Sequence, residues 1–354
     1  MLTSLKEFIR HALGPFYSIL TFLIDLLLPF RLTGYLYWPF VVSAILISLI
    51  VYLARAPFKP RSIARGFIAF LLPKSVYAHQ SAWVDLKYYA VNALLNRFVG
   101  LTALVSSFFG TLGVGLIAQR ALTALLGRPE HESDPSWMDR LGYTFAIVIV
   151  ADGALWISHF LEHKIGWLWE FHKVHHSAEV LTPLTNLRFH PVDVIFQNLW
   201  SVPATGFVVG LYGYWFPKGV VEISILGMSA AYFLGSIFGL LRHMHIRVGF
   251  GPITSLIFSS PAMHQLHHSS EPRHFDKNFG FILSLWDTIA GTNYIPAADE
   301  EYTLGIGDEG RAFHGVRALY FYPFLALARR IGLARKPKVE AAHPGDAVSQ
   351  PVKG

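Results

Sequence analysis

Residues 159–176 read HFLEHKIGWLWEFHKVHH and contain five histidines, and the architecture follows from this stretch. A related run, HQLHH, occupies residues 264–268. Side chains three and four positions apart lie on one face of a helix, so each run can aim its imidazoles at a common point. One tetrahedral ion takes only four ligands. The eight histidines of these runs therefore predict a site for two metal ions. They are His159, His163, His172, His175, His176, His264, His267 and His268.

The composition of the chain predicts that this site lies in a membrane protein. Hydrophobic residues make up 53% of the 354 residues and charged residues only 15%, unlike an ordinary soluble protein. The runs 35–54 and 98–118 are each long enough to cross a hydrocarbon core about 30 Å thick. A shorter run at 141–157 and a helical hairpin of 199–216 and 219–241 complete a bundle of four or five expected spans.

Basic residues after the first span predict the orientation of the bundle. They are Arg55, Lys59, Arg61, Arg65 and Lys74. Cytoplasmic loops carry an excess of lysine and arginine, and counting spans from this loop puts every histidine run on the cytoplasmic face. We expect an all-α, multi-pass protein of a bacterial inner membrane or the endoplasmic reticulum. A cytoplasmic cap of helices would hold the metals.

The chain divides into four regions by composition. We expect a membrane anchor region at 1–80, a catalytic membrane domain at 81–296, a partly helical extension at 297–334 and a disordered tail at 335–354. Within the first region, the short apolar run 16–30 carries a charge and favours an interfacial or re-entrant helix over a true span. A cleaved signal peptide is not expected, because no small-residue cleavage site follows this run.

Charge and cysteine content exclude several classes of function. The net charge of +6 fits anionic lipid headgroups, and no block of basic residues with interleaved aromatics indicates nucleic acid binding. Cysteine is absent from the sequence, which excludes disulfides, thiolate ligands, iron–sulfur clusters and a cysteine nucleophile. The metal ligands must therefore be histidines or carboxylates.

Other polar residues are candidates for supporting roles. His243 or His245 would supply a ninth ligand; a spacing of two does not put both on one helical face, and His243 is favoured. Asp152 lies two helical turns before His159, so it would accept a hydrogen bond from a ligating imidazole, although a packing role is equally compatible. His190 is a further candidate for such a role behind the ligands.

The remaining candidates are weaker. For His190 and His274, a loop hydrogen bond or an interfacial polar role is favoured over metal binding. Three glutamates near the runs could act as bases or bridging ligands, or could be solvated charges. They are Glu162, Glu170 and Glu179.

Three other chemistries compete with a dimetal site. His159, Glu162 and His163 also fit the H-x-x-E-H pattern of a zinc hydrolase, in which the glutamate activates water, but that interpretation leaves both His-x-x-His-His runs unexplained. Two axial histidines would serve a haem, which makes the paired histidines redundant. A serine hydrolase is disfavoured because no G-x-S-x-G elbow is present. A metal-stabilised lipid-binding protein without catalysis also remains open.

The histidine series resembles that of the fatty acid hydroxylase and sterol desaturase superfamily, over roughly residues 152–292. Matching motifs are Arg188-Phe189-His190-Pro191, Pro261, Asn278-Phe279-Gly280, Trp286-Asp287 and Gly291-Thr292. Two positions depart from the family pattern: Phe160 stands where members often carry arginine, and His245 where bacterial members often have asparagine. Neither difference removes one of the eight histidines.

The resemblance implies a membrane-bound di-iron oxidoreductase that uses O₂ to hydroxylate, desaturate or demethylate a lipid. It implies two iron ions, with zinc possible in a purified or inactive form. No G-x-G-x-x-G fingerprint for a flavin or nicotinamide follows a predicted strand, so electrons would come from a separate carrier such as a cytochrome b5-like protein or a ferredoxin. Sterols, hopanoids, fatty acyl chains, sphingolipids and carotenoids are all compatible substrates.

Overall fold

The computed structural model describes residues 38–55, 63–92, 113–129 and 134–333, and within them the chain is mostly helical. The α-helices are α2 (Trp38–Arg55), α3 (Ile63–Leu71), α4 (Lys74–Tyr77), a helix at 80–92, α6 (Gly113–Leu126), α7 (Trp137–Lys164), α8 (Gly166–His176), α9 (Pro191–Trp215), α10 (Ala230–Ser236), α11 (Gly239–Arg242), α12 (Pro261–His267), α13 (Leu285–Ala290) and α14 (Val316–Arg330). Short 3₁₀ turns are η3 (Pro183–Leu187), η4 (Thr254–Leu256), η5 (Pro272–His274) and η6 (Gly307–Phe313). The strands β1 (Ser224–Ile225) and β2 (Met228–Ser229) pair antiparallel.

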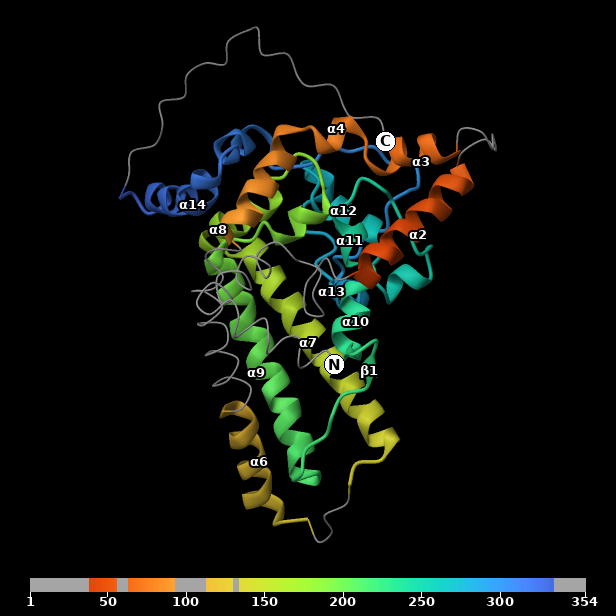
Figure 1. Ribbon diagram of the computed structural model, residues 1–354. Helices are drawn as coiled ribbons and strands as arrows, with labels where there is room; N and C mark the ends of the chain where they lie inside the picture. The colour runs from red at the N-terminus through yellow and green to blue at the C-terminus, as the bar shows by residue number, and fades with distance from the viewer. Residues whose placement is uncertain (1–37, 56–62, 93–112, 130–133, 334–354) are drawn as a thin grey trace, which may run out of the picture.

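Helices α7 and α9 form the shaft of the molecule and run in opposite directions, with α6 against the far end of α9 (Figure 1). Tyr143 and Ile147 of α7 pack on Val208 of α9. Both helices, and α2, are long and apolar enough to cross a membrane. Their outward faces expose large apolar side chains such as Phe145 and Phe207, as lipid-facing helices do.

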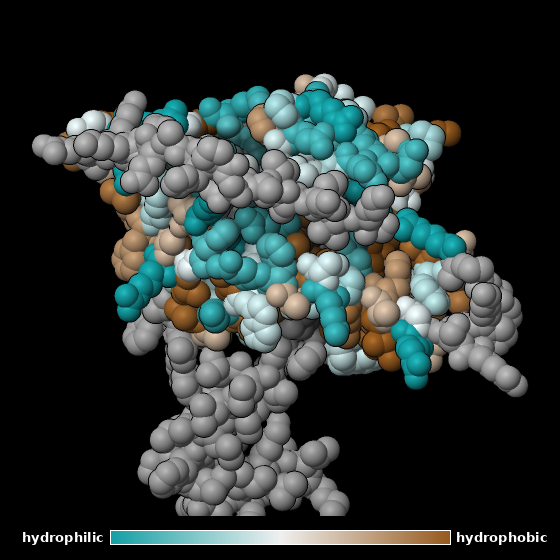
Figure 2. Space-filling view, turned by 90° about the horizontal axis from the view of Figure 1, so that it is seen from above, coloured by the Kyte–Doolittle hydropathy of each residue, from teal (hydrophilic) through white to brown (hydrophobic). Residues whose placement is uncertain are grey.

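The polar end of the molecule lies above this shaft, where α8, α11 and α12 gather (Figure 1). Figure 2 views that end, and hydrophilic residues gather over its middle while hydrophobic residues show at its edges. Helix α2 packs beside it through a core of Phe40 and Ala44 with Leu240 and Leu241. The described chain thus has an apolar shaft and a polar cap.

Local sequence signals explain how α7, α8 and α9 turn at this end. Helix α7 runs on to Lys164 and stops at Ile165, whose extended backbone (φ −97°, ψ 109°) redirects the chain into α8. Helix α9 starts where the His190 side chain accepts a hydrogen bond from Val192 N and Pro191 fills the first helical position. The turns bring the histidines of α7 and α8 to the same end of the shaft.

The prediction that 199–216 and 219–241 form a helical hairpin is wrong for residues 219–241. Residues 219–241 begin as an extended segment with a tight β-hairpin and then form the short helices α10 and α11. The turn residues Leu226 (φ 51°) and Gly227 (φ 80°) both have positive φ, which suits a two-residue hairpin and interrupts a helix. Helix α9 instead pairs with α7, and it begins at Pro191, earlier than expected.

Other expected segments shift or lie outside the described residues. The segment between the expected spans 98–118 and 141–157 is shorter than their bounds imply, because α6 continues to Leu126 and α7 already begins at Trp137 behind a Ser136 capping box. The segments 16–30 and 335–354 lie outside the described residues, as does most of the 98–118 run.

The C-terminal extension wraps the back of α8. Lys173 of α8 is buried and its Nζ lies 2.6 Å from Glu309 Oε1. Phe171 packs edge-on against Phe324 of α14, with ring centroids 5.1 Å apart. The extension therefore supports the outer face of the helix that carries His172, His175 and His176.

Candidate metal centre

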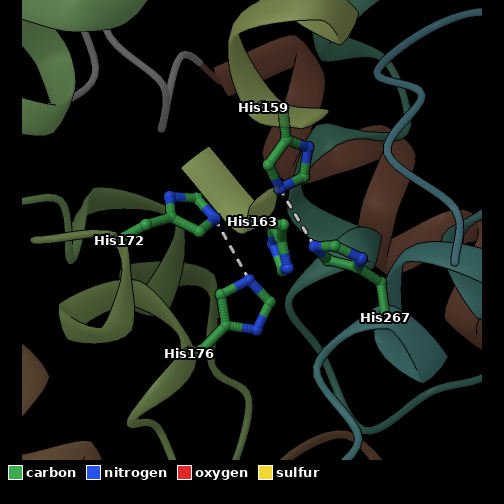
Figure 3. Close-up of side chains that lie close together, drawn as sticks. All are labelled: His159, His163, His172, His176 and His267. Atoms are coloured by element: carbon green, nitrogen blue, oxygen red, sulfur yellow. Dashed lines mark hydrogen bonds between the residues drawn. The ribbon is translucent and has the colours of Figure 1, made fainter. Parts of the chain in front are cut away.

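Nine histidines, seven of them buried, meet in two groups at the polar end of the shaft, and within each group the ligand atoms all lie within 4.8 Å of one another. Cluster A contains His159, His163, His172, His176 and His267; cluster B contains His175, His243, His264 and His268. The five rings of cluster A come from α7, α8 and α12 and face one point (Figure 3). The clusters adjoin, since the rings of His176 and His268 stack with centroids 4.6 Å apart.

Each His-x-x-His-His run divides between the clusters. In the first run His172 and His176, one helical turn apart, belong to cluster A, and His175 belongs to cluster B. In the second run the pair that is one turn apart joins cluster B, and His267 joins cluster A. The expectation that each run aims at one common point is therefore wrong. Adjacent residues on a helix differ in direction by about 100°, which lets the two members of a His-His pair serve different clusters.

The spacing of the imidazole nitrogens fits metal coordination. In cluster A the Nε2 atoms of His159 and His267 lie 3.0 Å apart, and those of His172 and His176 lie 3.1 Å apart (Figure 3). In cluster B the successive Nε2 contacts of His175, His243, His264 and His268 measure 3.3, 3.0 and 3.3 Å. Nitrogens bound at about 2.0–2.1 Å from one ion lie roughly 2.8–3.4 Å apart in octahedral or tetrahedral geometry.

Backbone carbonyls orient two of the cluster A rings. His159 Nδ1 lies 2.9 Å from Phe279 O, and His267 Nδ1 lies 2.6 Å from Lys277 O. A carbonyl can only accept, so each Nδ1 carries the proton and each Nε2 presents its lone pair to the cluster. This is the tautomer that a metal ligand needs.

Burial keeps these imidazoles neutral. Burial is the main cause that lowers the pKa of His243 and of His267 to about 3. Burial, followed by the neighbouring imidazoles, also holds the pKa of His175 and His264 well below 6.5. Neutral imidazoles are the ligand form, so near neutral pH the rings do not need to lose a proton before they bind an ion.

Two buried aspartates hold the loop that supplies these carbonyls. Asp287 accepts hydrogen bonds from the backbone N–H groups of Phe279 (3.0 Å) and Gly280 (2.7 Å). Asp152 accepts from Ile282 N (2.6 Å) and Leu283 N (3.1 Å). Asp152 therefore bonds this loop and not a ligating imidazole, in contrast to the first of the two roles expected for it. Asp152 therefore affects the clusters only through the position of this loop.

A buried ion pair fixes the end of α8. The guanidinium of Arg188, 1% exposed, donates to Val174 O (3.0 Å), to Ser177 Oγ (2.8 Å) and to Asp85 Oδ1 (2.9 Å) in the helix at 80–92. Because Val174 and Ser177 flank the adjacent pair His175 and His176, these bonds fix where the two rings lie.

Two of the candidate histidines do not reach either cluster. The Nε2 atom of His245 lies 2.7 Å from Phe70 O, so His243 alone supplies the ninth imidazole. The Nδ1 atom of His190 accepts from Val192 N and its Nε2 atom lies 3.1 Å from Tyr320 O. Thus His190 caps α9 and joins it to α14.

The weaker candidates make local contacts. His274 bridges Ser269 Oγ and Glu300 Oε1. Glu170 pairs with Lys173 at 2.7 Å, and Glu179 lies 3.0 Å from His314 Nε2. These residues belong to the scaffold around the clusters.

Sequence reasoning missed Asp193, a buried residue in the first turn of α9. Its Oδ2 lies 3.1 Å from His172 Nδ1, and Glu162 Oε2 lies 3.4 Å from the same atom. Asp193 lies two positions after Pro191, the last residue of the matching Arg-Phe-His-Pro motif. The sequence signal that could have identified it is an acidic residue in the helical turn that begins at this motif.

The fold and the site define the class of this protein: a helical protein with three helices of membrane-spanning length and a buried histidine centre that fits two metal ions. Comparison with known proteins adds a family resemblance. Residues 144–292 match the fatty acid hydroxylase family, which confirms the resemblance of the histidine pattern.

Individual relatives carry the names of lipid-modifying enzymes. The chain is 30% identical over 210 residues to the ornithine lipid hydroxylase OlsE of Rhizobium tropici, which is 57% of each chain. It is 23% identical to alkylglycerol monooxygenase of Caenorhabditis elegans, over 55% of this chain and 35% of that one. It is 28% identical to Delta(7)-sterol 5(6)-desaturase of Leptosphaeria maculans, over 44% and 38%. The chain thus spans between about a third and somewhat over half of these relatives. No solved structure gives a significant match.

Proposed function

We propose that this protein is an O₂-dependent, membrane-bound dimetal oxygenase that hydroxylates or desaturates a lipid. The observation that carries the proposal is the convergence of nine imidazoles on two adjacent points within the residues that match the fatty acid hydroxylase family. Iron is a redox-active metal suited to this chemistry, and an all-imidazole ligand set without thiols is compatible with it. Two irons held there would supply redox-active ions with open coordination positions for the activation of O₂, and the electrons would reach them from a separate carrier.

The residues of the chain perform the tasks around those ions. Nine histidines would hold them, and the carbonyls of Phe279 and Lys277 fix two of the rings in the ligating tautomer. Cluster B and three of the five cluster A histidines are buried, which limits the access of bulk water to the site and so limits side reactions. Helix α7 runs from the apolar shaft directly to His159 and His163 and joins the lipid phase to the site.

The substrate and the membrane orientation belong to the same proposal. The named activities of the relatives favour a lipid substrate, and the OlsE match makes an amino-acid-containing lipid the first class to test. The electrons come from a separate carrier, and the histidine clusters face the cytoplasm, as the basic residues after the first span suggest.

The geometry disfavours the zinc hydrolase. A general base must reach the water that the metal activates. Glu162 instead lies beside Nδ1 of His172, the ring edge opposite the Nε2 that faces cluster A. This carboxylate therefore supports a ligand from behind.

Metal analysis and lipid profiling test the proposal. We expect about two irons per purified chain, and a lipid in cells carrying the gene that gains one oxygen or loses two hydrogens. The conversion should stop without O₂ and in His267→Ala. A protein that binds lipid and metal but converts no lipid under O₂ and reductant would establish the carrier alternative. Turnover that persists anaerobically would establish a hydrolase.

A further inference from the structure

The two clusters differ in what lies behind their rings. In cluster A, three rings contact an acceptor through Nδ1: His159 and His267 reach carbonyls, and His172 reaches Asp193. In cluster B, no Nδ1 atom has a hydrogen-bond partner within the described part of the chain. The four side chains are His175, His243, His264 and His268, all at most 6% exposed.

The partner of His172 is a built arrangement of buried groups. Asp193 is 2% exposed and Glu162 1%, and they come from α9 and α7. Gln197 Nε2 donates hydrogen bonds to both, at 3.1 Å to Asp193 Oδ1 and 3.2 Å to Glu162 Oε2. Asp193 also lies in the first turn of α9, where the helix dipole favours a negative charge.

Such a carboxylate changes what the ring can do for a metal. It holds Nδ1 protonated, fixes the plane of the imidazole and makes Nε2 more basic. Loss of a partner of this kind costs about 10–100-fold in metal affinity. The rings of cluster B receive no such support from the described residues, and a bound ion there leaves buried N–H groups without acceptors.

We infer that Asp193 is a positioning residue for His172, and that through it cluster A retains its ion more tightly than cluster B. The inference rests on the proposed function only in taking each cluster as the site of one ion. It predicts an order of release: the cluster B ion leaves first.

The test measures release of metal from the full-length protein in detergent. The purified protein is loaded with Zn²⁺ and challenged with excess chelator, and the zinc remaining per chain is measured over time. We expect two phases of one ion each, with rates differing at least about 10-fold. Loading the metal-free protein with Co²⁺ assigns them: the first equivalent should give the weaker absorption of a five-coordinate ion, and the second the stronger bands of a four-coordinate one.

Substitutions at Asp193 connect the slow phase to this carboxylate. Asp193→Ala should speed the slow phase about 10–100-fold and leave the fast phase unchanged. Asp193→Asn keeps an acceptor without the charge, so its slow phase should have a rate between those of Asp193→Ala and wild type. This variant also tests the inference if Asp193→Ala does not fold. Glu170→Gln is the matched control, because it removes a buried carboxylate from α8 that faces Lys173. It should leave both phases unchanged.

Several results would overturn the inference. One is release of both ions in a single phase; another is a change confined to the fast phase in Asp193→Ala. A third zinc per chain that disappears in that variant would make Asp193 a ligand, because Glu162, His172 and Asp193 are close enough to hold an ion themselves. A wild-type chain that binds no metal would instead refute the proposed function.

Discussion

Gly280 offers a sharp test of how the loop behind cluster A works. Its N–H donates to Asp287 Oδ2 at 2.7 Å, and the preceding carbonyl, Phe279 O, accepts from His159. A Cβ added at Gly280 would lie 2.5 Å from Leu283 O and 2.9 Å from Asp287 Oδ2. Both neighbours are held in place, so Gly280→Ala must move the loop.

The size of the effect follows from those distances. The contact with Leu283 O is roughly 0.9 Å shorter than an ordinary one, and backbone must shift to relieve it. Overpacking of this kind lowers the free energy of unfolding by about 1–3 kcal/mol. A shift of the same size takes Phe279 O out of hydrogen-bond range of His159 Nδ1, which should weaken metal retention by about 10–100-fold.

The assay combines thermal unfolding in detergent with zinc retained after exposure to chelator. Gly249→Ala is the control, because a Cβ there meets no atom within 4 Å and should change neither quantity. A Gly280→Ala protein that melts like wild type and keeps its metal equally long would show that the loop does not position His159.

Three further predictions concern the scaffold. Arg188→Ala leaves Asp85 buried without its cation and should cost about 3–5 kcal/mol of unfolding free energy, measured by thermal melts against Arg188→Lys; an unchanged melting temperature would contradict it. In Gly210→Ala the new Cβ would lie 2.2 Å from Gly115 O, so α6 and α9 must separate; stability should fall by about 1–3 kcal/mol while metal content, at the opposite end of the shaft, stays at the wild-type value. The metal-free protein should lose stability as pH falls from about 6.5 towards 3, because the unfolded chain takes up protons that folded His267, with a pKa of about 3, does not; stability that is constant over this range would refute the argument.

The sequence predicted the histidines better than it predicted their arrangement. The eight motif residues were visible because helical spacing groups them and the absence of cysteine leaves imidazoles as the main candidate ligands. How they divide into two clusters was not visible. That division depends on how α7, α8 and α12 pack against one another, and spacing within a single run carries no information about it. The sequence could not decide between His243 and His245 as the ninth ligand for the same reason. Only the contact with Phe70 O shows that His245 points away from the clusters.

Membrane spans were predicted from hydropathy, which measures how apolar a segment is and carries no information about its backbone conformation. Residues 219–241 are as apolar as a span, but positive φ at Leu226 and Gly227 turns them into a hairpin. Asp193 escaped notice because a single aspartate after a proline has no distinctive spacing. Its role depends on α9 meeting α8, which is a property of the fold.

Helix α7 couples the metal centre to the surrounding bilayer. The same unbroken helix has the composition of a membrane span and carries His159 and His163 in its last turns. A helix whose apolar length differs from the thickness of the surrounding bilayer adjusts mainly by tilting. No loop lies between that span and these two imidazoles, so a change of tilt reaches them directly, while the other three histidines of cluster A sit on the separate helices α8 and α12. We therefore expect lipid chain length to alter the geometry of cluster A.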